Sequence, residues 1–194
     1  MNELTKIAAA NQQRAREVIR DSGLEAAWRS VGAEPNLVGS LRTGLLMTHH
    51  DIDFHIYSSP LRVADSFAAM ARLAENSRIR SITFNNLLDA PDQCLEWHAW
   101  YADADDQLWQ IDMIHMPRGS AYDGYFERVA DRIAAVLTDR TRETILRLKY
   151  ETPEAEKIMG IEYYQAVLRD GVGTYTEFEA WRAAHPVTGI LEWM

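Results

Sequence analysis

The chain has 194 residues, of which 47% are hydrophobic and 25% are charged, and its formal net charge is −9. This length suits one sizeable core, or a core domain with a small helical appendage, and the composition excludes disorder over most of the chain. The negative charge and the absence of any run of Lys and Arg disfavour a long nucleic acid as partner. A single nucleotide is not excluded, because a metal ion and a few backbone amides can hold one triphosphate.

Cysteine content and hydrophobic run lengths bear on the compartment. Cys94 is the single cysteine, so an internal disulfide is impossible and a reducing compartment fits. The N-terminal segment has neither an apolar core nor a basic leader of the kind found in signal peptides. No stretch approaches the roughly 18 apolar residues that a membrane span needs. We therefore expect a cytoplasmic protein.

The first part of the chain is predicted to be mostly helical. A polar, Ala-rich segment with helical spacing ends at Gly23, and a shorter helix follows it. Pro35-Asn36 indicates a turn, and the apolar segment LVGS after it indicates a short strand that runs into a glycine. The predicted helices cover residues 3–21, 24–31 and 41–47.

Alternating polar and apolar residues predict a strand over residues 51–57. Its acidic residues Asp51 and Asp53 share one face with His55, and the intervening apolar side chains form the face toward the core. Pro60 is predicted to open a helix that continues to about Glu75, since proline is well tolerated in a first helical turn.

Three further strands are predicted over residues 79–86, 94–102 and 107–116. The acidic turn at residues 103–106 predicts a hairpin between the last two. Pro117 and Gly119 then close this half of the chain.

The rest of the chain has a helical pattern. The predicted helices cover residues 123–136, 139–150, 153–169 and 174–183, with turns at Gly171, Gly173 and Pro186. We therefore predict an α+β protein in two parts. Residues 1–118 form an α/β domain with a mixed sheet and flanking helices, and residues 119–194 form a C-terminal helical region.

One constellation of residues predicts chemistry. Gly39 follows a predicted strand and precedes a helix, where backbone amides can face an anion, and the Ser40 hydroxyl adds another donor. Asp51 and Asp53 project two carboxylates from one strand face, a spacing that suits hard divalent cations. Asp112, on a later strand, could supply a third carboxylate. These are the groups needed for metal-assisted phosphoryl or nucleotidyl transfer.

This combination of motifs resembles the signature of the polymerase-β nucleotidyltransferase superfamily. It stands here as GSLRTGLLMTHHDIDFHI, with the third acidic residue in LWQIDMIH, and the resemblance covers roughly residues 30–116. The chain is most similar to the small-molecule, antibiotic and minimal nucleotidyltransferases, which also carry a C-terminal helical part. Many members have Ser or Thr where His50 stands, and this departure leaves the branch open.

The resemblance implies a role for each matched residue. Gly39 and Ser40 would hold the β- and γ-phosphates of a nucleoside triphosphate. Asp51 and Asp53 would bind two Mg²⁺ or Mn²⁺ ions. Asp112 would bind the catalytic metal and help deprotonate an acceptor hydroxyl, so these three carboxylates are the expected catalytic residues. Attack at the α-phosphate would release pyrophosphate.

Other residues have both a functional and a purely structural interpretation. Arg42 could reach a phosphate or lie on an exposed helix. Lys149 could contact the triphosphate from the helical half or lie on a solvated helix face. Trp97 and Trp109 could stack on a base, but a core position is favoured. The histidines could serve a zinc or iron hydrolase, although no spacing such as H-E-x-x-H is present.

The sequence therefore predicts an enzyme that transfers a nucleoside monophosphate, AMP being favoured, from a nucleoside triphosphate to a hydroxyl of a small molecule. No nucleic acid polymer or membrane is expected as partner, and the acceptor, the base preference and the oligomeric state stay open. Two other hypotheses remain. One is a non-catalytic member that binds nucleotide or a partner, and the other is a toxin–antitoxin component that modifies a protein. A P-loop is excluded, because Leu45-Leu46 follow Gly44 where that motif needs Lys and a hydroxyl residue.

Overall fold

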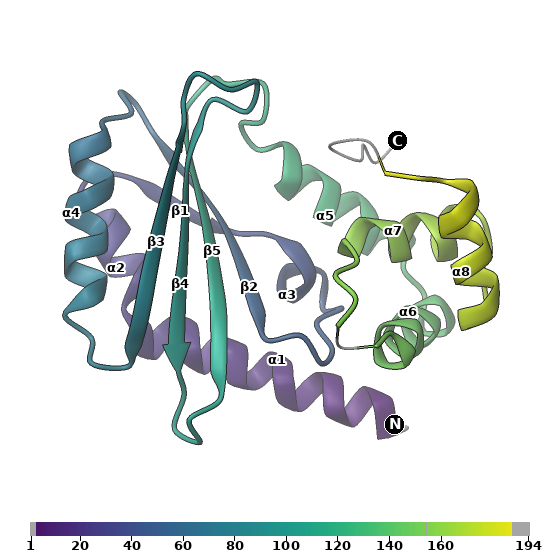
Figure 1. Ribbon diagram of the computed structural model, residues 1–194. Coiled ribbons are helices and arrows are strands. Elements are labelled where there is room, and N and C mark those ends of the chain that lie inside the picture. The colour runs from purple at the N-terminus through teal and green to yellow at the C-terminus, as the bar shows by residue number, and fades with distance from the viewer. Residues whose placement is uncertain (1–2, 154, 188–194) are drawn as a thin grey trace.

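The computed structural model describes residues 3–153 and 155–187. Its centre is one five-stranded mixed sheet with the strand order β1-β2-β5-β4-β3 (Figure 1). Strands β2 and β5 are parallel, and every other neighbouring pair is antiparallel. The strands are β1 Glu34–Leu37, β2 Asp51–Ser58, β3 Ile79–Leu87, β4 Cys94–Ala102 and β5 Leu108–Pro117.

The helices fall into an N-terminal group beside the sheet and a C-terminal group at one end of the molecule (Figure 1). The first group is α1 Glu3–Ser22, α2 Leu24–Arg29, α3 Gly39–Thr43 and α4 Val63–Ala74. The second is α5 Tyr125–Val136, α6 Asp139–Glu151, α7 Gly160–Tyr164, the π-helical turn η1 Gln165–Arg169 and α8 Tyr175–Ala184. Within the described ranges, no helix is both long and apolar enough to cross a membrane.

The main core lies on one face of the sheet. Alternation in β2 and β5 places apolar side chains such as Ile52, Phe54 and Met113 on this face, where they are almost completely buried. Helices α1, α2 and α4 cover them, and Trp28 of α2 is fully buried there. Burial of this apolar area is the main stabilising term of the domain.

The helical half has a core of its own, and this core includes one buried residue from the N-terminal half. Ile145, Leu148, Tyr163 and Phe178 form its centre, and Leu45 packs among them although it follows α3. The segment after α3 therefore belongs structurally to both halves. The division at residue 118 stays a prediction.

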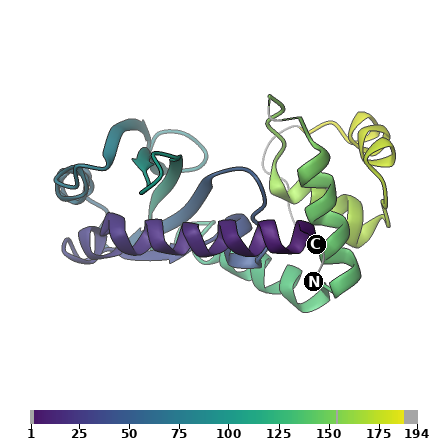
Figure 2. The ribbon, with the colours of Figure 1, turned by 90° about the horizontal axis from the view of Figure 1, so that it is seen from below.

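Helix α1 also connects the two halves. It runs along the sheet and reaches α6 (Figure 2). Near its start, Ala8 packs with Met47 and Leu146. Further along, Arg14 forms ion pairs with Asp103 and Asp105 in the β4–β5 turn. One helix thus contacts the β4–β5 turn, the loop before β2 and the helical half.

Most predicted strands and helices are confirmed with small boundary shifts, and three differences concern the residues at which elements begin or end. Pro35 lies in strand β1, not in a turn, and β1 is an edge strand, where a residue without an N–H is tolerated. Helix α4 begins at Val63, so Pro60 is not in its first turn. Helix α3 ends at Thr43 because Gly44 has a left-handed conformation with φ 70°.

The predicted helix over residues 153–169 is wrong in its first part. Helix α6 ends when Thr152 takes an extended conformation with ψ 127°, as expected for a residue that precedes a proline. The next helix, α7, begins only at Gly160. Residue 154 lies outside the described residues.

Candidate active site

Strand register places the three predicted carboxylates on one face of the sheet. Strands β2 and β5 run parallel, with Asp53 opposite Asp112 and Asp51 opposite Gln110. Residues opposite each other in neighbouring strands project to the same side, and Asp51 is two residues from Asp53. This face lies opposite the apolar core, and the placement agrees with the arrangement predicted from the sequence.

The charges of these carboxylates affect one another. Burial, and then the neighbouring charges of Asp51 and Asp112, raise the pKa of Asp53 to about 7, whereas Lys149 acts in the opposite direction. Asp53 as a whole residue keeps intermediate exposure to solvent. The negative charges of the three carboxylates therefore repel one another, and a bound cation would relieve this repulsion.

The chemistry of the donors fits a hard divalent cation, because carboxylate oxygens are the ligands that Mg²⁺ and Mn²⁺ prefer. In the part of the chain that the structure describes, no group of three or more His, Cys, Asp or Glu is gathered so that it could hold a metal ion as it stands. The three carboxylates share a face without converging on one point. Binding an ion would therefore require side-chain adjustment.

The start of α3 lies directly against Asp53. The backbone N–H of Val38 donates to the Asp53 carbonyl at 2.9 Å. Gly39 has φ +66°, and a Cβ at this position would lie 1.9 Å from Oδ2 of Asp53. Both the backbone conformation and the close approach require glycine. The sequence motif thus has a physical basis, since only glycine lets α3 begin beside the carboxylate.

A buried lysine from the helical half completes the arrangement. Lys149 of α6 is 7% exposed, and its Nζ donates to Ser40 Oγ at 2.8 Å and to the Leu45 carbonyl at 3.0 Å. The Tyr164 hydroxyl lies 3.3 Å from Ser40 Oγ. The alternative of a solvated Lys149 is therefore wrong. A cation and two hydroxyls therefore lie at the start of α3, beside Asp53, whose charge Lys149 influences.

Arg42 has other partners. Its Nη2 forms an ion pair of 2.8 Å with Asp131 of α5, and its Nη1 donates to the Leu37 carbonyl at 3.2 Å. These contacts attach α3 to α5. A phosphate-binding role for Arg42 stays a prediction that its present contacts do not support.

Two residues of the site were missed from the sequence. His98 of β4 lies opposite Asp112, and its Nδ1 is 2.5 Å from Asp112 Oδ1. Tyr164 approaches Ser40 from α7. Alternation in β4 gave a signal for His98, because Trp97 and Ala99 on either side of it are core residues and His98 must then lie on the other face.

Burial decides between the two interpretations of the tryptophans and locates one of the histidines. Trp97 and Trp109 are 3% and 0% exposed and belong to the main core, so the favoured interpretation is confirmed. His115 is fully buried between the hydroxyls of Ser58 and Ser66. None of the described histidines belongs to a cluster that could hold a metal.

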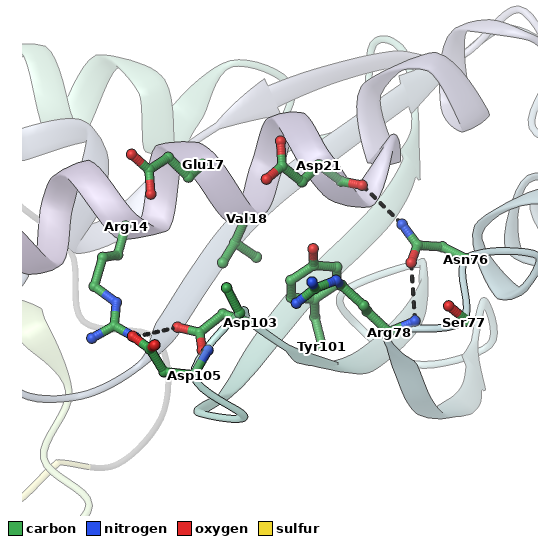
Figure 3. A pocket seen from close by; sticks show the side chains of 11 residues that line it. Arg14, Glu17, Val18, Asp21, Asn76, Ser77, Arg78, Tyr101, Asp103 and Asp105 are labelled. Carbon is green, nitrogen blue, oxygen red and sulfur yellow. Dashed lines mark hydrogen bonds and ion pairs between the residues drawn. The ribbon is translucent and has the colours of Figure 1, made fainter.

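A surface hollow of about 260 Å³ lies elsewhere, between α1, the start of β3 and the β4–β5 turn (Figure 3). Arg14 contacts Asp103 and Asp105 within it, and Asn76 donates to the Asp21 carbonyl. Its polar groups are thus largely engaged with one another, and none of the three predicted catalytic carboxylates lines it. We do not assign the chemistry to this hollow.

Comparison with known proteins gives information at the level of the fold. No family model and no curated protein sequence matches the chain. Among solved structures, the Cid1 poly(U) polymerase bound to Mg 3′-dATP has a TM-score of 0.58 at 15% identity, with 86% of this chain and 54% of that chain covered. A second Cid1 structure, described for RNA terminal uridylyl transferase activity, has a TM-score of 0.56 at 15% identity over 86% and 52% of the two chains.

A cytoplasmic RNA terminal U-transferase gives a TM-score of 0.55 at 14% identity, over 86% of this chain and 53% of the other. The chain has the fold of the polymerase-β-like nucleotidyltransferases. It spans about half the length of these nucleotidyltransferase structures. This likeness confirms the predicted fold class. The register of β2 and β5 in this chain places Asp51, Asp53 and Asp112 on one face of the sheet.

Proposed function

We propose that this protein is a metal-dependent nucleotidyltransferase that moves a nucleoside monophosphate from a nucleoside triphosphate to an acceptor hydroxyl. One observation carries the proposal. In a nucleotidyltransferase fold, strand register brings Asp51, Asp53 and Asp112 to one face of the sheet. Gly39 lies beside them, and any side chain at this position would collide with Asp53.

Each residue has a distinct role in the proposed reaction. Asp51, Asp53 and Asp112 would hold Mg²⁺, which when bound neutralises phosphate charge and favours displacement at the α-phosphorus. Ser40 Oγ and Lys149 Nζ, already in mutual contact at 2.8 Å, donate to the β- and γ-phosphates. Residues 1–118 thus supply the carboxylates, and residues 119–194 supply the cation.

The chemical step balances without a further reactant. The acceptor oxygen forms a bond to the α-phosphorus, and the bond from that phosphorus to the bridging oxygen of the β-phosphate breaks. Pyrophosphate leaves with the bonding electron pair. The hydroxyl proton goes to a carboxylate oxygen of Asp112, which is suitable as a general base because it lies on the same face as the other two carboxylates.

We propose a small molecule as the acceptor and ATP as the favoured donor. The similar structures include RNA terminal uridylyl transferases, so an RNA 3′-hydroxyl is the competing acceptor. Two properties favour the small molecule. The chain has a net charge of −9, and neither β4 nor β5, which carry the open face around Asp112, contains Lys or Arg. A polyanion gains little from such a surface.

The test is incubation with labelled ATP, GTP, CTP and UTP in Mg²⁺, with pyrophosphate release measured over a panel of hydroxylated small molecules, an RNA oligonucleotide and a protein mixture. We expect release that depends on a small molecule and is lost in Asp51→Ala and Asp53→Ala. Transfer to RNA or to protein alone would contradict the acceptor class. Nucleotide binding without any release would instead favour the non-catalytic alternative.

A further inference from the structure

The two carboxylate oxygens of Asp112 have different surroundings. Oδ1 accepts hydrogen bonds from His98 Nδ1 at 2.5 Å and from Gln110 Nε2 at 2.8 Å. Across residues 3–153 and 155–187, we find no hydrogen bond to Oδ2. One oxygen is thus anchored to the sheet, and the other is available to a ligand.

His98 is itself held in place by Glu96 of its own strand, which in turn contacts the neighbouring strand β3. Its Nε2 lies 3.4 Å from Glu96 Oε1, and the other oxygen of Glu96 accepts from Asn85 Nδ2 at 2.8 Å. A polar chain therefore crosses the open face of the sheet from β5 through β4 to β3. Because an ionised carboxylate only accepts hydrogen bonds, the proton of this His98–Asp112 contact lies on Nδ1.

We propose that His98 is a positioning residue that fixes the third carboxylate, Asp112, for metal binding and for acceptance of the acceptor's proton. This inference rests on the proposed nucleotidyl transfer. A carboxylate that keeps one oxygen bonded to the sheet presents the other in a fixed direction, and rate falls steeply when such a group is displaced. His98 itself touches neither phosphate nor acceptor in this account.

The decisive variant is His98→Ala, compared with His98→Asn, whose amide nitrogen can take the place of Nδ1. We expect His98→Ala to lower kcat by about 10- to 100-fold, to change KM for the nucleotide by less than about threefold, and to weaken Mn²⁺ binding by about tenfold. His98→Asn should recover much of both losses. Mn²⁺ affinity, measured by electron paramagnetic resonance without nucleotide, gives a readout independent of turnover.

Thr83→Ala is the matched control, because Thr83 lies opposite His98 on β3 and on the same face without contacting Asp112. This variant should bind Mn²⁺ like the wild type. If His98→Ala and His98→Asn both keep wild-type Mn²⁺ affinity and kcat, the positioning role is wrong. If the wild type binds no Mn²⁺ and releases no pyrophosphate, the proposed function fails first, so the two failures are distinguishable.

Discussion

At the scale of single residues, Asp53 is the clearest case of a group whose position lowers the stability of the folded protein. Its pKa is raised to about 7, so the folded protein retains a proton there that the unfolded chain has lost. The folded state therefore binds more protons than the unfolded state between about pH 4 and pH 7, and this contribution to stability falls as pH rises through that window.

Asp53→Asn should consequently stabilise the metal-free protein while abolishing its function. After allowance for solvent screening, we expect a gain of roughly 2 kcal/mol at pH 8, or about 6 °C in Tm. Added Mg²⁺ should raise the Tm of the wild type and leave that of the variant unchanged. Calorimetry with and without Mg²⁺ measures both effects, and a variant less stable than metal-free wild type would show that the charges are not in conflict.

His115 gives a pH dependence of the opposite sign. It lies fully buried between Ser58 and Ser66, and burial lowers its pKa to about 4. Below about pH 6.5 the unfolded chain takes up a proton that the folded state refuses, so stability is lost as pH falls toward 4.

Urea unfolding at pH 7 and pH 5 tests this effect. When the pH falls from 7 to 5, the titration of His115 should lower the free energy of unfolding by about 2 kcal/mol. The His115→Gln variant should lack this part of the pH dependence, even if its stability at pH 7 differs from that of the wild type. An unchanged difference between the two pH values in the variant would assign the effect to other groups.

The sequence was informative at this scale where the signal is local. Asp51 and Asp53 are two residues apart on a strand, and alternation alone assigns them to one face. His98 and Tyr164 were missed because their partners, Asp112 and Ser40, are defined by strand register and helix packing, which no local pattern contains.

At the scale of secondary-structure elements, the important contact is between the start of α3 and strand β2. Gly39→Ala should both strain the backbone, by about 1–2 kcal/mol, and displace the Asp53 carboxylate from its position. We expect activity to fall by about 100-fold or more, as when a catalytic group moves by an ångström. Steady-state pyrophosphate release and thermal unfolding measure the two effects.

Gly32→Ala separates the effect of backbone strain from the effect of a collision between the new Cβ and Asp53. Gly32 has φ +77°, close to that of Gly39, but a Cβ there meets no atom within 4 Å. This control should lose a similar amount of stability and keep its activity. Equal activity losses in the two variants would mean that the contact with Asp53 does not matter.

Element prediction succeeded where periodicity was strong and failed where proline intervened. Strands β3, β4 and β5 were found to within a residue or so from alternation and the acidic hairpin turn. Strand β1 was read as a turn because of Pro35, and the helix expected from residue 153 begins at Gly160. The edge position of β1 makes Pro35 compatible with a strand, whereas Pro153 keeps the residue before it extended and so ends α6.

At the scale of the whole molecule, the two halves are joined at the candidate site. Lys149 of α6 contacts Ser40 and the Leu45 carbonyl, and the Leu45 side chain lies in the core of the helical half. The sequence predicted an α/β half and a helical half. It could not predict this packing, because Leu45 and Lys149 are far apart in the chain.

Lys149→Met tests the contribution of the helical half, since Met keeps most of the side-chain volume and removes the charge. We expect the affinity for nucleoside triphosphate to fall by about tenfold or more, because a buried cation that would pair with phosphate is lost. Titration calorimetry with a non-hydrolysable triphosphate measures it. Wild-type affinity in the variant would exclude Lys149 from phosphate binding.

The central claim is that Asp51, Asp53 and Asp112 hold divalent ions against a triphosphate that Ser40 and Lys149 contact. The most direct measurement is a crystal structure of the protein with Mn²⁺ and a non-hydrolysable nucleoside triphosphate, with the ions located by anomalous scattering. We predict Mn²⁺ peaks within bonding distance of all three carboxylates, and the triphosphate beside Gly39 and Ser40. Ions or nucleotide bound away from these carboxylates would contradict the account.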